Sequence, residues 1–380
     1  MSGPSYGAGQ APQPNRTALI MAGGTGGHVF PALAVASLLQ ARGFRIVWLG
    51  TRKGIEARVV PGHGFEMVWV RMSGMRANGY LRWLMAPFTL GIALAAAIGA
   101  FLRYRPDVVL GMGGYTAFPG GVAAMLLGRP LVIHEQNSVA GLTNRLLACR
   151  AARVLVGFPS AFGGPKDTPI FCRARETQWC GNPVRPAIAD LEAPEARFGA
   201  RSGPLRVLVL GGSLGAAALN ECVPQALALL APDTRPHVVH QAGPKHLEPL
   251  NAHYRAAGVE AVTRAFIDDM AAQYAWADVV ICRAGALTLA ELAAAGVGSV
   301  LVPYPYAVDD HQTRNALFLT GSDAALLLPQ SELTARRLAA LIGELTRERL
   351  LAMALAARAL GRPRATEDVA QVCMEMAHAA

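Results

Sequence analysis

Lysine is nearly absent from this 380-residue chain, because 3 of its 35 basic residues are lysines and the others are arginines. A bias of this size points to genome composition as much as to a basic surface. The formal net charge of +9 therefore favours acidic partners in general, among them nucleic acid, phosphorylated substrates and anionic lipid. Aromatic residues make up 7% of the chain and no nucleic-acid-binding motif occurs, so we expect no nucleic-acid partner.

Closely spaced cysteines are also missing. The six cysteines are widely spread, and no two of them have the spacing of metal ligands. Asp309, Asp310 and His311 follow a predicted strand, but they lack Asp-x-Asp spacing and a second set of ligands. Residues 1–16 lack the apolar stretch of an export signal, and we expect a disordered lead-in there. The sequence thus predicts a cytoplasmic protein that requires no metal cofactor, although a divalent ion stays possible.

An uncharged run of 19 residues from Leu84 to Leu102 reaches the length of a membrane span. It contains Pro87 and lies between two predicted parallel strands, so we expect a crossover helix that packs on the sheet. Between Arg71 and Arg105 five arginines and no acid stand among apolar and aromatic residues, which favours binding to an anionic bilayer surface. An ordinary helix with a basic face fits these residues equally well. The candidate membrane-binding residues are Arg76, Arg82, Trp83 and Phe88.

A glycine-rich loop follows a short apolar strand twice. Residues 17–22 lead into Gly23-Gly24-Thr25-Gly26-Gly27-His28, and residues 205–210 lead into Gly211-Gly212-Ser213-Leu214-Gly215. Glycine lets a ligand approach the backbone, and the helix that follows offers unpaired N–H groups to an anion. We therefore predict two nucleotide-binding-type domains with an anionic substrate between them.

Neither loop is a dinucleotide fingerprint. The first lacks the third glycine, the second lacks the spacing, and neither half has an acid at the end of its second strand to bind a ribose. These absences disfavour a nicotinamide-dependent oxidoreductase. Arg52 and Lys53 could still hold the 2′-phosphate of NADP, so that alternative stays open.

Composition and pattern divide the chain into two domains. Hydrophobic residues make up 52% of the chain, enough for two cores. The predicted segments are a lead-in at 1–16, an acceptor and membrane-association domain at 17–184, a donor domain at 185–360, and a final helix at 361–380 that returns to the first domain. Strands are expected near residues 17–22, 45–49, 66–70, 107–111, 130–134 and 153–156, and near 205–210, 237–241, 260–264, 278–282 and 299–302.

Polar residues gather where these strands end. Glu291 lies in the first turns of a predicted helix, where a carboxylate can accept both hydroxyls of a ribose. An equally good alternative is a capping box, in which Glu291 accepts the N–H of Thr288. The amides of Gln312 and Asn315 suit sugar hydroxyls. The motifs at 111–115 and 134–137 fall on the same rim as His28.

Taken together, these motifs resemble the MurG family of N-acetylglucosaminyltransferases, and the resemblance covers nearly the whole chain after residue 16. The matching segments are residues 23–28, 111–115, 134–137, 181–185, 211–215, 266–270, 282–288 and 311–312. The resemblance implies an α/β protein with a GT-B glycosyltransferase fold, in which two Rossmann-like domains with parallel sheets face each other across a cleft. Ala284, where serine is often found, and Met75-Arg76 depart from the family pattern, and the second departure bears on the acceptor side.

The resemblance also implies roles for individual residues. The donor UDP-N-acetylglucosamine would be bound by Thr25, Gly26, Gly27, Asn137, Arg185, Ser213, Ile267, Ala286, Leu287, Thr288, Leu289, Ala290, Glu291 and Gln312. Within this set Arg185 and Ser213 would lie at the phosphates, the Ile267 backbone at the uracil and Glu291 at the ribose. The acceptor would be bound by Gly113, Gly114, Tyr115, His134 and Glu135.

The expected activity is inverting transfer of N-acetylglucosamine to the 4-hydroxyl of the muramic acid of lipid I, at the inner face of the cytoplasmic membrane. The expected partners are UDP-N-acetylglucosamine, lipid I, anionic lipid and other proteins of cell-wall synthesis. His28 is the predicted base, because the positive end of a helix keeps an imidazole neutral; His134 and Glu135 are alternatives. A UDP-N-acetylglucosamine epimerase, an NADP-dependent oxidoreductase and a non-catalytic membrane-surface protein are the competing hypotheses.

Overall fold

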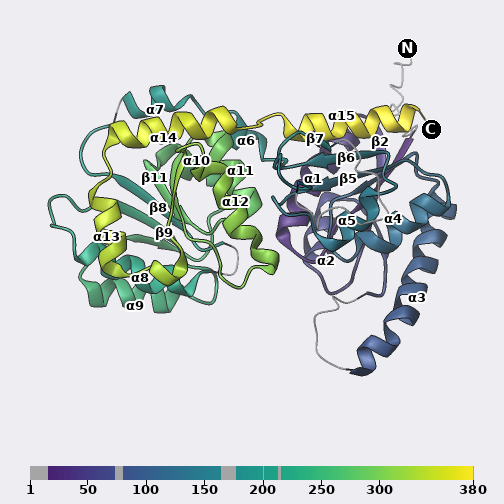
Figure 1. Cartoon of the computed structure of the whole chain (residues 1–380), viewed down its shortest axis with the longest axis horizontal. Helices are drawn as coiled ribbons and strands as arrows, with labels where there is room; N and C mark the ends of the chain where they lie inside the picture. Colours follow the sequence, from purple (N-terminus) through teal and green to yellow (C-terminus); the bar gives the residue numbers. More distant parts are fainter. Residues whose placement is uncertain (1–15, 73–79, 164–176, 200, 213–214, 380) are drawn as a thin grey trace, which may run out of the picture.

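The computed structural model describes residues 16–72, 80–163, 177–199, 201–212 and 215–379, with the backbone alone for residues 80–86 and 308. Two parallel sheets, one in each half of the chain, organise these residues (Figure 1). Every strand pair is parallel, and most strands read as continuous buried runs because helices cover both faces.

The first sheet has the strand order β3-β2-β1-β4-β5-β6-β7. The strands are β1 (Arg16–Met21), β2 (Phe44–Gly50), β3 (Glu66–Trp69), β4 (Val108–Gly111), β5 (Leu131–Glu135), β6 (Arg153–Val156) and β7 (Thr177–Trp179). The order reverses between β1 and β4, and the crevice beyond the carboxyl ends at such a reversal is where open α/β sheets bind ligands.

The second sheet repeats this arrangement as β10-β9-β8-β11-β12-β13. Its strands are β8 (Arg206–Leu210), β9 (His237–Gln241), β10 (Val262–Arg264), β11 (Val279–Cys282), β12 (Gly298–Leu301) and β13 (Ala325–Leu327). The reversal lies between β8 and β11, so the second glycine loop occupies the same topological position as the first. The predicted pair of Rossmann-like domains is confirmed.

Helices connect the strands of each sheet. Those of the first half are α1 (Gly26–Ala41), α2 (Glu56–Val59), α3 (Tyr80–Tyr104), α4 (Ala117–Leu126) and α5 (Leu142–Ala148), with a 3-10 turn η1 (Val60–His63). The remainder are α6 (Pro186–Ala189), α7 (Pro194–Gly199), α8 (Ala217–Ala228), α9 (Leu247–Ala257), α10 (Met270–Trp276), α11 (Ala286–Ala295), η2 (Val308–Asp310), α12 (His311–Thr320), η3 (Gln330–Glu332), α13 (Ala335–Gly343), α14 (Arg347–Leu360) and α15 (Ala365–His378).

The last two helices run one after the other along both halves of the molecule (Figure 1). Helix α14 packs against α11 and β12 of the second half, whereas α15 packs against α1 and β4 of the first. Val369 and Cys373 of α15 are fully buried in the same core as Ala18 and Val35. The chain therefore crosses between the halves a second time before it ends.

The segment that leads from the first half into the second meets the segment between α14 and α15 at Gly181. This residue has a φ of +85°, and a Cβ there would overlap the side chain of Arg362. The guanidinium of Arg362 lies 3.8 Å from the centroid of the Trp179 ring. Only glycine permits both this backbone conformation and this close approach.

Helix α3 is the long crossover between β3 and β4. Ala93, Ala97 and Phe101 are buried against the sheet, as expected of a crossover helix. The other end of α3 projects away from the domain (Figure 1), and Phe88 is 69% exposed. The segment Pro87–Tyr104 is long and apolar enough to cross a membrane by length and composition alone, and 22% of it is buried. Among the side chains of α3 that the structure describes, those buried against the sheet thus lie in the second half of the helix.

The cysteines differ in state. Cys180, Cys222, Cys282 and Cys373 are buried free thiols, and burial raises the pKa of Cys180, Cys282 and Cys373 to about 12. Cys149 is disulfide-bonded, which the wide spacing of the cysteines did not predict.

Candidate active site

The first glycine loop packs directly against the loop that follows β4. Gly113 and Gly114 have φ values of +88° and +80°, and a Cβ on Gly114 would overlap the carbonyl oxygen of Gly23. A Cβ on Gly113 would lie 3.1 Å from Cε1 of His28. The half-buried ring of His28 therefore rests on two residues that must be glycines.

The start of helix α1 is open to an anion. Its N-cap residue, Thr25, is extended, its side chain makes no capping hydrogen bond, and no acid stands in the first turn. The N–H groups of Gly26 and Gly27 have no partner within the helix, and the dipole adds positive potential there. A phosphate group of a substrate could accept from these N–H groups.

His134 and Glu135 stand at the end of β5 and are both buried. His134 Nε2 is 2.9 Å from the carbonyl oxygen of Gly181, and burial lowers the pKa of this histidine to about 4. The carboxylate of Glu135 accepts from the backbone N–H groups of Asn137 and Gly141 and from the Asn144 amide at 2.9–3.0 Å. Their placement favours support of the acceptor surface over direct contact with it, and both are less accessible as bases than His28.

Glu56 is a site residue that the sequence analysis missed. Its fully buried carboxylate accepts from the N–H of Gly24 at 3.1 Å, and from the N–H and hydroxyl of Thr51 at 3.0 and 2.8 Å. It holds the first glycine loop to the end of β2. The one signal in the sequence was Gly54, which lies so close to this carboxylate that no side chain would fit.

Gln241 organises the second half-site. Its amide donates to the carbonyl oxygen of Gly212 at 3.0 Å and accepts from the N–H of Ile267 at 3.2 Å. One neutral side chain thus joins the second glycine loop to the segment predicted to read the uracil. Gly215, with a φ of +84°, closes this loop against the carbonyl of Ala242. Ser213 lies outside the described residues.

Glu291 is held by two side chains from other elements. Arg185 donates from Nε and an Nη to Oε1 at 3.2 and 2.8 Å, and the buried hydroxyl of Tyr274 donates to Oε2 at 3.0 Å. Burial raises the pKa of Tyr274 well above its usual value, so this phenol stays a donor. Helix α11 begins at Ala286 with Gly285 as its N-cap and no side-chain cap. The capping-box alternative for Glu291 is therefore wrong, because the helix starts too early for Thr288 to cap it.

Asn315 joins the two halves by hydrogen bonds. Its Oδ1 accepts from the N–H and the hydroxyl of Ser138, each at 2.8 Å, and its amide donates to Asn137 at 3.3 Å and to the carbonyl of Ala284 at 3.2 Å. Gln312 lies one helical turn earlier, where its Oε1 accepts the N–H of Tyr304 at 2.9 Å. The predicted sugar-binding residues Asn137 and Gln312 are thus on neighbouring elements.

The structure brings the predicted site residues together in two groups. Thr25, Gly26, Gly27, His28, Gly113, Gly114, Tyr115, His134, Glu135 and Asn137 line the carboxyl edge of the first sheet. Arg185, Ile267, Gln312 and residues 286–291 surround the corresponding edge of the second sheet. Arg82, Trp83 and Phe88 lie on α3, apart from both groups, and Arg76 lies outside the described residues.

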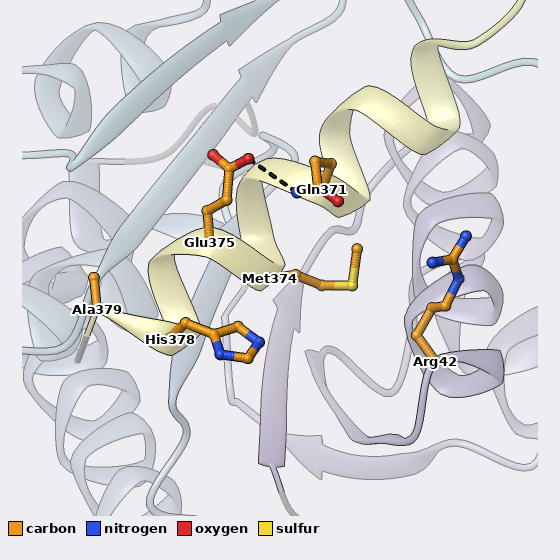
Figure 2. Close-up of a pocket in the computed structure, with 6 residues that line it drawn as sticks. All are labelled: Arg42, Gln371, Met374, Glu375, His378 and Ala379. Atoms are coloured by element: carbon orange, nitrogen blue, oxygen red, sulfur yellow. Dashed lines mark hydrogen bonds between the residues drawn. The ribbon is translucent and has the colours of Figure 1, made fainter.

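A groove of about 540 Å³ lies elsewhere, between Arg42 and the exposed side of α15 (Figure 2). Arg42 follows the last turn of α1, whereas the glycine loop precedes its first turn. At 1.5 Å per residue the helix separates the two by roughly 24 Å. This groove is therefore not part of the candidate active site. In the described part of the chain, no three His, Cys, Asp or Glu side chains come together as metal ligands.

Comparisons with known proteins agree with this geometry. The glycosyltransferase family 28 N-terminal domain model matches residues 18–156, and the C-terminal domain model of that family matches residues 206–369. A protein of Thiobacillus denitrificans is 59% identical over 363 residues, which span 96% of this chain and 99% of the relative. A protein of Dechloromonas aromatica is 56% identical with the same coverage. Both are named UDP-N-acetylglucosamine--N-acetylmuramyl-(pentapeptide) pyrophosphoryl-undecaprenol N-acetylglucosamine transferase.

Solved structures give the same result. MurG of Acinetobacter baumannii superimposes with a TM-score of 0.82 at 40% identity, over 95% of this chain and 99% of that one. The glycosyltransferase of kitacinnamycin, at 21% identity and a TM-score of 0.68, shares the fold.

Proposed function

Since the chain belongs to the MurG family of glycosyltransferases, we propose that it transfers N-acetylglucosamine from UDP-N-acetylglucosamine to the 4-hydroxyl of the N-acetylmuramic acid of lipid I. The enzyme is an inverting hexosyltransferase, and its product is lipid II, the precursor of peptidoglycan. An epimerase or an NADP-dependent oxidoreductase is not favoured by relatives that are named transferases over almost their full length.

The observation that carries this proposal is the union of two unlike half-sites by Asn315. The first half offers an uncapped helix end beside a histidine, and the second offers a carboxylate and an arginine beside a glycine loop. A transfer between two large substrates needs two such surfaces, one for each substrate. An epimerase acts on a single nucleotide sugar and needs no surface for a second substrate.

On the donor side, Glu291 accepts the ribose hydroxyls and the Ile267 backbone binds the uracil. Arg185 then turns from Glu291 to the diphosphate, where Ser213 also binds. The positive charge of Arg185 and the dipole of α11 stabilise the charge that grows on the leaving diphosphate. With this charge supplied by the chain, we expect transfer to need no divalent ion.

On the acceptor side, the diphosphate of lipid I binds at the start of α1, which brings the 4-hydroxyl to His28. The hydroxyl oxygen attacks C1 of N-acetylglucosamine while the bond from C1 to the UDP oxygen breaks and UDP leaves with the electron pair. His28 takes the hydroxyl proton as general base. A single displacement of this kind inverts the configuration at C1.

The test is a transfer assay with radiolabelled UDP-N-acetylglucosamine and a lipid I analogue, with parallel reactions without acceptor and with EDTA. We expect label in the lipid product, no epimerised donor, and undiminished transfer in EDTA. Epimerised donor in the absence of acceptor would instead establish the epimerase. Loss of transfer in EDTA, with recovery on adding Mg²⁺, would refute metal independence alone.

We also propose that the enzyme is peripheral to the cytoplasmic face of the cell membrane and docks on anionic lipid through α3 and α4. Phe88 and Ile92 of α3 and Leu126 of α4 are exposed, and Arg103 and Arg105 are exposed at the other end of α3. At the Arg103 end of α3, Leu102 is exposed as well, and an apolar side chain beside cations suits the boundary between lipid headgroups and acyl chains. The predicted contributors Arg76, Arg82 and Trp83 belong to the same stretch of chain.

Vesicle co-sedimentation tests this docking surface. Binding should be strong to vesicles that contain phosphatidylglycerol, weak to pure phosphatidylcholine, and should weaken as salt rises because screening reduces the electrostatic attraction. Phe88→Ser should reduce binding, whereas Leu229→Ser, which removes another exposed apolar side chain, from the second half, should not. Equal binding to both vesicle types, or equal loss in both variants, would refute the assignment.

A further inference from the structure

A chain of hydrogen bonds runs from the crossing between the two halves to His28. His134 Nε2 is 2.9 Å from the carbonyl oxygen of Gly181, and His134 Nδ1 is 3.1 Å from Nε2 of Gln136. At the other end of the same amide, Gln136 Oε1 is 2.7 Å from Nδ1 of His28. His134 and Gln136 are 0% and 1% exposed, so these contacts are shielded from water.

The orientation of the Gln136 amide follows from its other neighbour. The atom assigned as Nε2 is also 3.1 Å from the carbonyl oxygen of His134, which can only accept a hydrogen bond. Reversing the amide would place two acceptors in contact at this buried position, which is costly. The NH2 group therefore faces His134, and the oxygen faces His28.

The tautomer of His134 follows in the same way. Its Nε2 faces a carbonyl oxygen and must carry a hydrogen, whereas its Nδ1 faces the Gln136 NH2 group and must accept. Burial keeps this ring neutral by lowering its pKa to about 4, so one hydrogen is all that it carries. Each donor in the chain then meets one acceptor.

From this arrangement we propose that Gln136 is a positioning residue that selects the tautomer of His28 with its hydrogen on Nδ1. The inference rests on the proposed function, in which His28 is the base. Because Gln136 Oε1 can only accept, Nδ1 of His28 must donate to it, and the lone pair of the neutral ring is then on Nε2. The His28 ring packs on Gly113 and Gly114, which restricts rotation of the ring and fixes the direction in which Nε2 points.

The selected tautomer is the one that the reaction needs. Nε2 takes the proton from the 4-hydroxyl, while the hydrogen on Nδ1 stays in its bond to Gln136. The resulting imidazolium donates a stronger hydrogen bond to the amide oxygen than the neutral ring does, which stabilises the charge formed during transfer. In the other tautomer, Nε2 already carries a hydrogen and cannot accept one.

Nitrogen NMR of the full-length enzyme with ¹⁵N-labelled histidine reads this tautomer directly, with the His28→Gln variant to assign the signal. We expect wild-type His28 to carry its hydrogen on Nδ1 at neutral to mildly alkaline pH. Gln136→Met keeps the length of the side chain but loses the acceptor, and should populate the other tautomer. We expect kcat to fall about 10- to 100-fold in this variant. UDP affinity, measured by calorimetry, should stay within about twofold, since this loop does not bind the nucleotide.

Two further variants complete the test. Gln136→Glu, which takes up a proton at this buried position, can still accept from His28 and donate to His134, and should restore both the tautomer and most of kcat. Gln371→Met alters an exposed glutamine that bonds only to Glu375 on the same helix among the described residues, and should change nothing.

The proposal is overturned if wild-type His28 carries its hydrogen on Nε2, or if Gln136→Met changes the tautomer without lowering kcat. Should Gln136→Met fail to fold, the wild-type spectrum and Gln136→Glu still decide it. A wild-type enzyme that transfers no sugar to lipid I would refute the proposed function instead, and the NMR result would stand apart from that failure.

Discussion

The two halves of the molecule have the same strand order, but they support their glycine loops with opposite chemistry. In the first half the buried carboxylate of Glu56 accepts a hydrogen bond from the N–H of Gly24. A second buried carboxylate, that of Glu135, accepts hydrogen bonds from backbone N–H groups of the loop after β5. In the second half the support is neutral. The Gln241 amide holds the carbonyl of Gly212, and Asn220, bonded to His240, holds the carbonyl of Ala242.

This difference matches the charge that each half handles in the proposed reaction. A histidine becomes positive in the first half, and the carboxylates behind it favour that change. A diphosphate becomes more negative in the second half, where a buried carboxylate behind the loop would oppose it. Glu291, which carries a charge in the second half, is paired with Arg185 before the donor binds and is assigned to the ribose, not to the diphosphate. The backbone arrangement is thus the same in both halves, whereas the charge that develops during the reaction is positive in the first half and negative in the second.

The largest effect should come from His28→Ala, which removes the proposed base from the first half, where buried carboxylates support the loops. Turnover should fall about 100- to 10,000-fold while UDP affinity stays nearly unchanged. Steady-state kinetics with a lipid I analogue, and calorimetry with UDP, measure the two quantities. Turnover close to that of the wild type would exclude His28 as base, and a parallel loss of UDP affinity would assign it to binding.

Acid should destabilise both halves, because each buries one neutral histidine. Burial lowers the pKa of His134 to about 4 and that of His240 to about 3, from an ordinary value of 6.5. Below about pH 6.5 the two histidines take up protons in the unfolded chain but not in the native chain. The free energy of unfolding is therefore highest above this pH and decreases as the pH falls towards 4. The loss is on the order of 3 kcal/mol per histidine. Urea unfolding from pH 7 to 4.5 measures it.

The His240→Gln variant separates the contribution of His240 to the pH dependence from that of His134. It removes the titrating group from the second half only, so the slope of stability against pH should decrease by roughly half while His134 continues to act. An unchanged slope would mean that acid destabilises the enzyme through other groups.

A reciprocal exchange tests the electrostatic comparison itself. Glu56→Gln leaves one buried donor of the first loop without an acceptor, and should lower the free energy of unfolding by about 2 kcal/mol with little effect on UDP affinity. Gln241→Glu puts a carboxylate behind the second loop, and should weaken UDP binding about tenfold or more. Urea unfolding and calorimetry on both variants decide the matter. If both variants lost UDP affinity equally, the two supports would not differ in function.

Much of the fold could be predicted because its strands carry strong local signals. The apolar runs of β1 and β8, each followed by glycines, were placed within about two residues, which is the usual error of element boundaries. Strands β7 and β13 were missed. Each has three residues and lies at the edge of its sheet. Neither Thr177–Trp179 nor Ala325–Leu327 shows a periodic pattern, so pairing with a neighbour, not propensity, makes them strands.

The site could be predicted only where a motif carries its own chemistry. The glycine loops and Glu291 were predicted as candidates in this way, whereas Glu56, Gln241 and Tyr274 were not. Glu56 contacts a residue 32 positions earlier, and Tyr274 meets Glu291 from a different helix. Such partners become visible only when tertiary structure brings distant segments together. The capping box had the right spacing and failed because α11 begins at Ala286, so Thr288 lies inside the helix and cannot cap it.

The smallest effect should come from Tyr274→Phe, which removes one hydrogen bond to Glu291 and leaves the ring in the core. Loss of this bond frees the carboxylate to rotate, so UDP binding should weaken by about 1 kcal/mol, roughly fivefold. Glu291→Ala should weaken it by about 1 to 3 kcal/mol, because the ribose loses its acceptor. In both variants 2′-deoxy-UDP, which has one hydroxyl fewer to bond to Glu291, should lose less affinity than UDP does, so the preference for ribose shrinks. Calorimetry with UDP and 2′-deoxy-UDP, together with thermal unfolding, separates this result from a structural one. A lower melting temperature with an unchanged preference for ribose would make Tyr274 a packing residue and remove it from the recognition of the nucleotide.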